Sequence, residues 1–466
     1  MSTHSLKIEN KDLTQRPLLK KMIMFTIPLV LTGMLQLLYS ATDIICLGHF
    51  ASDQSAGAVS STGALVNLVV NLFIGLSLGS STVAARYIGA DDPDKVQKVV
   101  HTSIALALVS GILLTIFTVP LTKYFLIAMN VPESILPLST LYLQIYFGGL
   151  PFAFIYNFGS ALLRAEGDTK HPLIFLIAAG VINVSLNLTL VIVCKMDVAG
   201  VGIGTIVAQA IAAALTMIYL ARHNGPCKFY IKKLSFDKKM LKEVIRIGLP
   251  AGIESSLFAI SNVIIQSAIN SFGDLTIAAN GDAWNIEGVI YLSMNAVTQA
   301  ALTFTGQNYG ANKKKNIDVA MWDAMLLTTI IGLVTGLTVY FAADYIMQIY
   351  TTNPEVIALA KERLRVVCSV YLLCGVMEVL GAVMRGIGHS FAPMAISLLG
   401  VCLFRVIYIY SIFQVYHTTT VLYLSYPISW ILTILVQGVC LIFVRKKEFK
   451  KMDKLLSPDK DKIIKA

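Results

Sequence analysis

The chain has 466 residues, of which 56% are hydrophobic and only 14% charged, with a formal net charge of +10. An average soluble domain carries about 25% charged residues, so this composition excludes a soluble protein of this length. The apolar runs, on the order of 20 to 30 residues, match the hydrocarbon core of a bilayer. Because they are too long for barrel strands, we predict an all-α integral membrane protein.

In chain order, the apolar runs predict twelve transmembrane helices. They cover residues 21–47, 57–85, 99–122, 136–162, 172–194, 199–221, 244–271, 276–306, 317–349, 358–384, 393–416 and 419–444. One long polar stretch, from Arg222 to Lys242, interrupts them. The expected organisation is therefore a cytoplasmic tail (1–16), an amino-terminal six-helix lobe (17–221), a cytoplasmic linker (222–242), a carboxyl-terminal six-helix lobe (243–446) and a basic tail (447–466).

The second lobe repeats the first in sequence. Segment 164–172 returns as segment 385–393, and segment 87–90 returns as segment 308–311, both at an offset of 221 residues. Six spans return the chain to the same side of the membrane, so the repeats are parallel. Many secondary transporters are built from such repeats and hold their substrate between moving units. We therefore expect a transporter.

The basic residues indicate the orientation. With the amino terminus in the cytoplasm, 31 of the 37 Lys and Arg fall on inner segments and one, Arg405, falls inside a span. The five assigned to outer loops are Lys123, Lys195 and, at the outer start of the run 358–384, Lys361, Arg363 and Arg365. This asymmetry follows the positive-inside rule. We predict a cell-membrane protein with both termini in the cytoplasm, whose positive charge contacts anionic lipids rather than nucleic acid.

Polar side chains inside the first-lobe spans are candidate functional groups. Gln36, Tyr39 and Asp43 are spaced i, i+3, i+7 and share one helical stripe, while Asn183 and Asn187 are spaced i, i+4. Together they predict a polar cavity. The alternative is that Asp43 is simply hydrated at the outer end of its helix.

In the second lobe, Glu254, Glu287 and Glu378 lie within apolar runs, and Arg405 is expected to neutralise one of them. The alternative is a buried Glu–Arg pair that only holds helices together. Arg385, like Arg164, is interpreted as an anchor at the inner end of its helix, with a role in gating as the alternative.

A charge at the bilayer centre costs about 2.5–3.5 kcal/mol on insertion scales, so such residues indicate function. A partly buried carboxylate can hold a proton when it faces one side of the membrane. It can exchange that proton for Na⁺ or an organic cation when it faces the other side. Such competition couples ion entry to substrate exit without covalent chemistry. Cysteines without CxxC spacing and scattered histidines predict neither a bound metal nor an enzyme.

Four segments together resemble the multidrug and toxic compound extrusion family, over residues 17–446. They are 163–169 followed by Pro172, 283–288, 306–311 and 384–388. The resemblance implies two six-helix lobes forming a V and export of organic cations driven by H⁺ or Na⁺. We expect no cofactor beyond the coupling ion. Because transport needs only one chain, we also expect function as a monomer.

The resemblance also implies site residues. The first-lobe ion site maps onto Asp43, with Gln36, Tyr39, Asn157, Asn183, Asn187 and Thr205 nearby, although some proton-coupled members carry Asp where this chain has Asn187. The second-lobe acids of one branch match Glu254 and Glu287. An Asp of that branch falls here at Gly375, with Glu378 one turn away. These matches place Na⁺, if it is the coupling ion, at Asp43 or Glu254.

Three other functions remain for comparison. A flippase for lipid-linked oligosaccharides, found in the wider superfamily, would need several basic residues in its cavity. Here only Arg405 lies deep in the membrane, against at least four carboxylates, which favours a cationic cargo. An ion channel would need a filter loop, and a membrane enzyme would need a catalytic motif, neither of which is visible.

Overall fold

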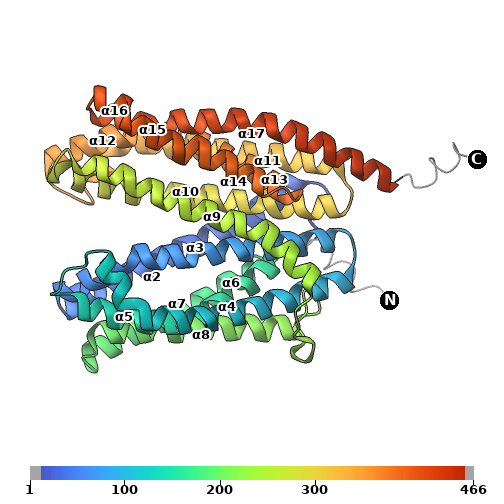
Figure 1. Cartoon of the computed structure of the whole chain (residues 1–466), viewed down its shortest axis with the longest axis horizontal. Helices are drawn as coiled ribbons and strands as arrows, with labels where there is room; N and C mark the ends of the chain where they lie inside the picture. The colour runs from blue at the N-terminus through green and yellow to red at the C-terminus, as the bar shows by residue number, and fades with distance from the viewer. Residues whose placement is uncertain (1–11, 457–466) are drawn as a thin grey trace, which may run out of the picture. The chain divides into compact units, whose positions relative to one another are not determined.

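The computed structural model describes residues 12–456, and all regular structure in this part of the chain is helical. The predicted all-α class is therefore confirmed. The first repeat contains α2 (Leu18–Phe50), α3 (Asp53–Gly89), α4 (Pro93–Ala128), α5 (Leu136–Gly148), α6 (Leu150–Ala165), α7 (Lys170–Leu188), the π-helical turn η1 (Thr189–Val193) and α8 (Asp197–Arg222) (Figure 1). A short 3₁₀ turn, η2 (Ile231–Lys233), lies in the linker.

The second repeat begins with three long helices, α9 (Lys238–Asn270), α10 (Asp274–Gly310) and α11 (Lys314–Met347). It continues with α12 (Pro354–Cys368), α13 (Leu372–Gly386), α14 (Phe391–Ser397), the π-helical segment η3 (Leu398–Leu403), α15 (Phe404–Tyr410), α16 (Ile412–Val415) and α17 (Thr419–Leu456).

The described residues divide into two compact units. The first unit comprises residues 27–88 and 92–252, and the second comprises 12–26, 89–91 and 253–456. The lobe boundaries expected from sequence, 17–221 and 243–446, stay predictions. The expected tails, 1–16 and 447–466, lie partly outside the described residues.

Nine helices of the described chain are long and apolar enough to cross a membrane, and two bent helix pairs raise the count to eleven. The 37-residue α10 is the twelfth long element, and it carries several acids. The spans expected at 136–162 and 358–384 are not straight. They bend by 47° between α5 and α6 and by 42° between α12 and α13. Pro151 explains the first bend, because proline has no N–H for the helical ladder.

The backbone itself repeats. Gly167 and Gly388, both just past a helix end, have φ of 93° and 99°. Asp91 and Asn312 have φ of 53° and 59°. Both pairs are 221 residues apart. Because glycine adopts positive φ without the strain of a Cβ atom, the sequence repeat reflects a repeated turn geometry.

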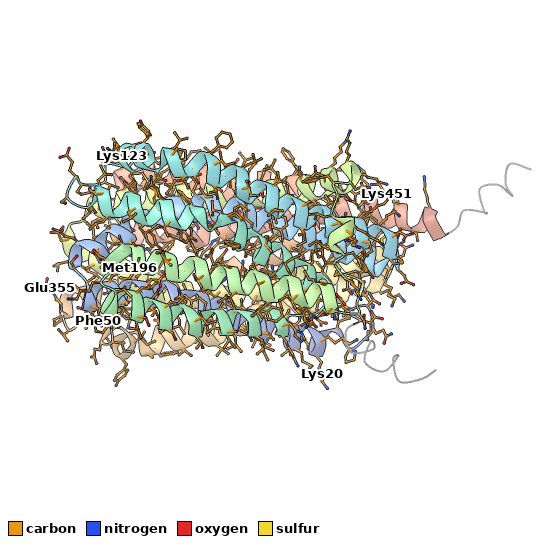
Figure 2. All side chains as sticks on the ribbon, turned by 90° about the horizontal axis from the view of Figure 1, so that it is seen from below. Lys20, Phe50, Lys123, Met196, Glu355 and Lys451 are labelled. Atoms are coloured by element: carbon orange, nitrogen blue, oxygen red, sulfur yellow. The ribbon has the colours of Figure 1, made fainter. Side chains whose placement is uncertain are left out.

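The ends of the helices in each unit agree with an alternating arrangement of spans. In the first unit, Phe50, Lys123 and Met196 lie at the same end (Figure 2). In the second unit, Glu355 lies at the end opposite Lys20 and Lys451 (Figure 2).

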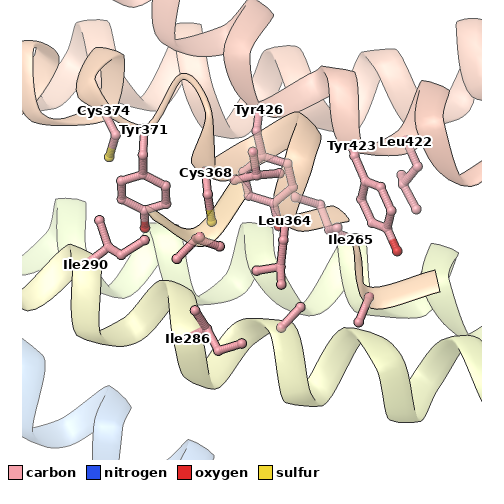
Figure 3. Close-up of a cluster of buried hydrophobic side chains, with 14 of the residues drawn as sticks. Ile265, Ile286, Ile290, Leu364, Cys368, Tyr371, Cys374, Leu422, Tyr423 and Tyr426 are labelled. Atoms are coloured by element: carbon pink, nitrogen blue, oxygen red, sulfur yellow. The ribbon is translucent and has the colours of Figure 1, made fainter. Parts of the chain in front are cut away.

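In the core of the second unit, α12 packs against both α10 and α17 (Figure 3). Ile286 and Ile290, one turn apart on α10, belong to the same buried cluster as Leu364 and Cys368, one turn apart on α12. Tyr426 of α17 completes this part of the cluster. The buried charges described below are set within this packing.

Candidate functional site

A ring of hydrogen bonds surrounds Asp43 in the first unit. Asp43 is 7% exposed on α2. The Asn187 amide nitrogen donates to Asp43 Oδ1 at 2.6 Å, and the Thr205 hydroxyl donates to Oδ2 at 3.3 Å. Asn187 also donates to Asn183 Oδ1 at 3.3 Å, and Asn183 donates to the Thr205 hydroxyl at 3.4 Å. Three helices, α2, α7 and α8, therefore bring four polar side chains together.

Local helix geometry explains this convergence. Asn183 and Asn187 stack one turn apart on α7, as their spacing predicts. The π-helical turn η1 begins immediately after α7, and such turns are frequent at functional sites. A Cβ atom on Gly204 of α8 would overlap Asn187 Oδ1, so glycine makes room for this amide. That oxygen is buried and has no hydrogen-bond partner among the described residues.

The other three residues predicted for this site lie outside the ring. Tyr39 donates its hydroxyl to the Leu176 carbonyl oxygen on α7. Asn157 donates to the Ala153 carbonyl of its own helix at 2.9 Å. Gln36 is exposed. The stripe that Gln36, Tyr39 and Asp43 form in sequence therefore does not act as one group in the structure.

Asp43 has only uncharged partners. No ion pair among residues 12–456 involves its carboxylate. A buried charge that lacks an opposite charge is costly, and a bound proton or cation removes that cost. In addition to the Asp43 carboxylate, the side chains of Asn183, Asn187 and Thr205 contain oxygen atoms. Hard cations prefer oxygen ligands.

The glutamates of the second unit are in a different environment. Glu287 forms a two-pronged ion pair with Arg363, through Nε at 2.7 Å and Nη2 at 2.8 Å. Arg363 is fully buried and also donates to Asn280. Its guanidinium is surrounded by the rings of Trp284, Tyr423 and Tyr426. Glu254 accepts from Arg385 Nη2 at 2.5 Å.

These pairs correct two expectations. Arg405 forms no ion pair with Glu254, Glu287 or Glu378 among the described residues. It donates to the Ser429 hydroxyl at 3.0 Å, and its guanidinium carbon lies 4.1 Å from the centre of the Tyr426 ring. Arg385 is not a surface anchor, because it is only 8% exposed and pairs with Glu254. Glu378, two turns before Arg385 on α13, is half-buried.

Sequence reasoning missed Arg363, which it had placed on an outer loop. Its helix carried a usable signal. The buried residues of α12 recur at intervals of three and four, at Val356, Ala360, Arg363 and Val367. Arg363 therefore falls on the buried stripe of an amphipathic helix, where a charge requires a partner.

Comparisons with known proteins agree with this architecture. The MatE family model matches residues 28–189 and 250–411, which are equivalent parts of the two repeats. The probable multidrug resistance protein YoeA of Bacillus subtilis strain 168 is 28% identical over 393 residues, covering 82% of this chain and 84% of that protein. The multidrug export protein MepA of Staphylococcus haemolyticus strain JCSC1435 is 24% identical over 375 residues, covering 80% of this chain and 82% of that protein.

A solved structure shares the fold. It is a MOP superfamily transporter from Pyrococcus furiosus, for which reverse polarity of the binding pocket suggests a different function. The TM-score is 0.84 at 21% identity, over 98% of this chain and 99% of that chain. At this identity the likeness establishes the fold and leaves the cargo to be argued from the site.

Proposed function

Because the chain belongs to the MatE family, we propose that it is a cation-coupled antiporter that exports organic cations across the cell membrane. Transport proceeds by alternating access, and the energy comes from inward flow of H⁺ or Na⁺. The chain works as a monomer with both termini in the cytoplasm. The repeats, the distribution of basic residues and the multidrug relatives support this proposal.

A single observation carries the coupling site. Asp43 is a buried carboxylate whose partners are all neutral, whereas Glu254 and Glu287 are each neutralised by an arginine. A carboxylate already paired with arginine gains little from a proton or a metal cation. Asp43 gains a great deal, so the ion binds in the first unit.

The ring can serve both states of Asp43. In the structure, Asn187 points its N–H₂ group at the carboxylate and leaves its own oxygen buried and unpaired. This orientation suits an ionised Asp43. Rotation of the amide by half a turn places the oxygen toward Asp43 instead, where it can accept from a protonated carboxyl group or bind Na⁺. Asn183 and Thr205 supply further oxygens.

The charge of the described membrane segments supports a cationic cargo. Asp43 and the half-buried Glu378 have no arginine bonded to them among the described residues, while the buried arginines 363 and 385 are occupied by acids. An anionic cargo such as a pyrophosphate-linked glycan would require free guanidinium or ammonium groups. Arg405 also has no acid partner among the described residues. It is a single guanidinium engaged with Ser429 and Tyr426, against two carboxylates without an arginine.

Efflux of ethidium from proteoliposomes tests the proposal. The purified protein is reconstituted, and a pH gradient and a Na⁺ gradient are imposed in separate experiments. We expect efflux under one gradient, which also identifies the ion. No efflux under either gradient, from protein that is folded by circular dichroism, contradicts the proposal and favours the flippase.

A further inference from the structure

The outward face of α17 changes character along the helix. In the last apolar turns before the basic residues, its exposed residues are Leu435, Val436, Val439, Ile442 and Phe443. At 3.6 residues per turn these five lie within an arc of about 120°. A membrane protein presents such a surface to lipid tails, so this arc is the lipid-facing side of α17.

Four exposed lysines continue the same face. They are Lys446, Lys447, Lys450 and Lys454, hereafter the lysine stripe. The helical repeat puts them within an arc of about 100°, which overlaps that of the apolar residues. Lys446 and Lys447 follow Phe443 by one turn. The surface that contacts lipid tails therefore passes directly into a purely cationic surface.

The opposite face of this segment is fixed to the second unit. Glu448 is 2% exposed, accepts from the Tyr309 hydroxyl at 2.8 Å and pairs with His389 Nε2 at 3.0 Å. Lys451 also pairs with Glu448, at 2.6 Å. These contacts stop the helix from rotating, so the lysine stripe keeps its orientation toward lipid.

The neighbouring acids are occupied. Asp318 pairs with Arg445 at 3.2 Å, and Asp453, which borders the stripe, pairs with Lys314. No ion pair among residues 12–456 involves a lysine of the stripe. The stripe therefore carries four positive charges that have no acidic partner among the described residues.

Position along the helix selects the partner. Lys446 is about 4.5 Å beyond Phe443 and Lys454 about 16 Å beyond it, at 1.5 Å per residue. The polar layer of a bilayer extends roughly 5–8 Å beyond the hydrocarbon core on each side, and a lysine side chain can reach back toward it. We propose that the lysine stripe binds the phosphate groups of anionic phospholipids in the leaflet next to the carboxyl terminus.

This inference rests on the proposed function only for the assignment of that leaflet to the cytoplasmic side. Each lysine near an anionic surface raises affinity about fivefold. Because the stripe is held on α17, it recruits acidic lipids to one side of the second unit rather than evenly around the protein.

Tryptophan quenching by brominated lipids tests the proposal with the full-length protein. The substitution Phe443→Trp places a reporter one turn from the stripe, and protein with native Phe443 supplies the background from the native tryptophans. Vesicles contain phosphatidylcholine and phosphatidylglycerol in one fixed proportion, with the bromine carried by either lipid. We expect quenching per bromine to be at least about twofold stronger when phosphatidylglycerol carries it, and the preference to fall with salt.

The decisive variant changes all four lysines of the stripe to Gln. In this variant, the ratio of quenching by brominated phosphatidylglycerol to quenching by brominated phosphatidylcholine should fall to one. A matched control changes Lys232, Lys233, Lys238 and Lys239 to Gln, which alters the net charge equally and should leave the ratio unchanged. Equal quenching by both lipids in the Phe443→Trp protein with its lysines intact overturns the proposal. A preference for phosphatidylglycerol that survives loss of the stripe also overturns it. Ile442→Trp is the alternative reporter if Phe443→Trp fails to fold. The assay requires no transport, so its result is independent of whether ethidium is exported.

Discussion

The membrane-embedded acids of this chain have different neighbours, and a carboxylate responds to its neighbours. Asp43 has amide and hydroxyl donors, whereas Glu287 has a guanidinium at 2.7 Å. A buried ion pair contributes little net stability, because desolvation offsets most of the attraction. Breaking one leaves a buried charge, which is strongly destabilising. The two kinds of site therefore respond differently to the same substitution.

The Glu287–Arg363 pair gives a stability prediction. Glu287→Gln leaves the fully buried Arg363 without its counter-charge, so we expect a loss of about 3–5 kcal/mol in the free energy of unfolding. Thermal unfolding of the purified protein in detergent measures it. The double substitution Glu287→Leu with Arg363→Met removes both charges, and most of the loss should be recovered. A single variant as stable as the parent would contradict a buried, paired Arg363.

Residue spacing predicted part of the site and missed part of it. The i, i+4 spacing of Asn183 and Asn187 is local, so it was readable before the fold was known, and both amides join the Asp43 ring. The partner of Glu287 was not readable in this way, because Arg363 is 76 residues away along the chain. A charge near a predicted span end resembles a loop charge unless the helical stripe of its neighbours is considered.

At the scale of elements, the two repeats share turns that only certain residues can form. Gly388 follows α13 with φ of 99°. In Gly388→Ala, a residue with a Cβ atom must adopt the left-handed backbone conformation. We expect this to lower the free energy of unfolding by about 1–2 kcal/mol. Gly167→Ala should have a similar effect on the equivalent turn. Thermal unfolding is the measurement, and Gly438→Ala, in α17 with no atom within 4 Å of an added Cβ, is the control that should be neutral or slightly stabilising.

The start of α9 gives a pH-dependent prediction. Asp237 Oδ1 accepts from the Met240 amide at 3.0 Å and the Lys239 amide at 2.9 Å, and Lys98 lies 3.7 Å away. The hydrogen bond from the Met240 amide lowers the pKa of Asp237 below its ordinary value, with the Lys239 amide and Lys98 acting in the same direction. These hydrogen bonds make Asp237 a cap for the first turn of α9. The stabilisation by this cap is fully present above the ordinary pKa of an aspartate and is lost as the pH falls through the lowered pKa of Asp237.

Hydrogen exchange of the first-turn amides of α9 checks this. Asp237→Ala should speed exchange several-fold at neutral pH relative to the parent. Asp237→Asn keeps a capping oxygen but cannot titrate, so its protection should not change with pH beyond the intrinsic rate. Identical pH dependence in the Asn variant and the parent would show that Asp237 is not the titrating cap.

At the scale of the whole molecule, composition and periodicity predicted the helical class and the positions of the long apolar elements. They did not predict the bends between α5 and α6 or between α12 and α13, because mean apolarity is the same in a bent and a straight span. Pro151 was a visible signal for the first bend. The π-helical turns η1 and η3 also had no sequence signal, since they change backbone hydrogen bonding without changing composition.

The central claim is that the Asp43 carboxylate links ion movement to substrate movement. The measurement compares two activities of the same proteoliposomes: gradient-driven ethidium accumulation, and exchange of labelled for unlabelled ethidium without a gradient. Asp43→Asn should lose gradient-driven accumulation, to the level of protein-free vesicles, and keep exchange, because the cavity still alternates. The exposed Asp274→Asn serves as the matched control and should retain both activities. Accumulation by Asp43→Asn equal to that of the parent would contradict the claim and move the coupling site away from the first unit.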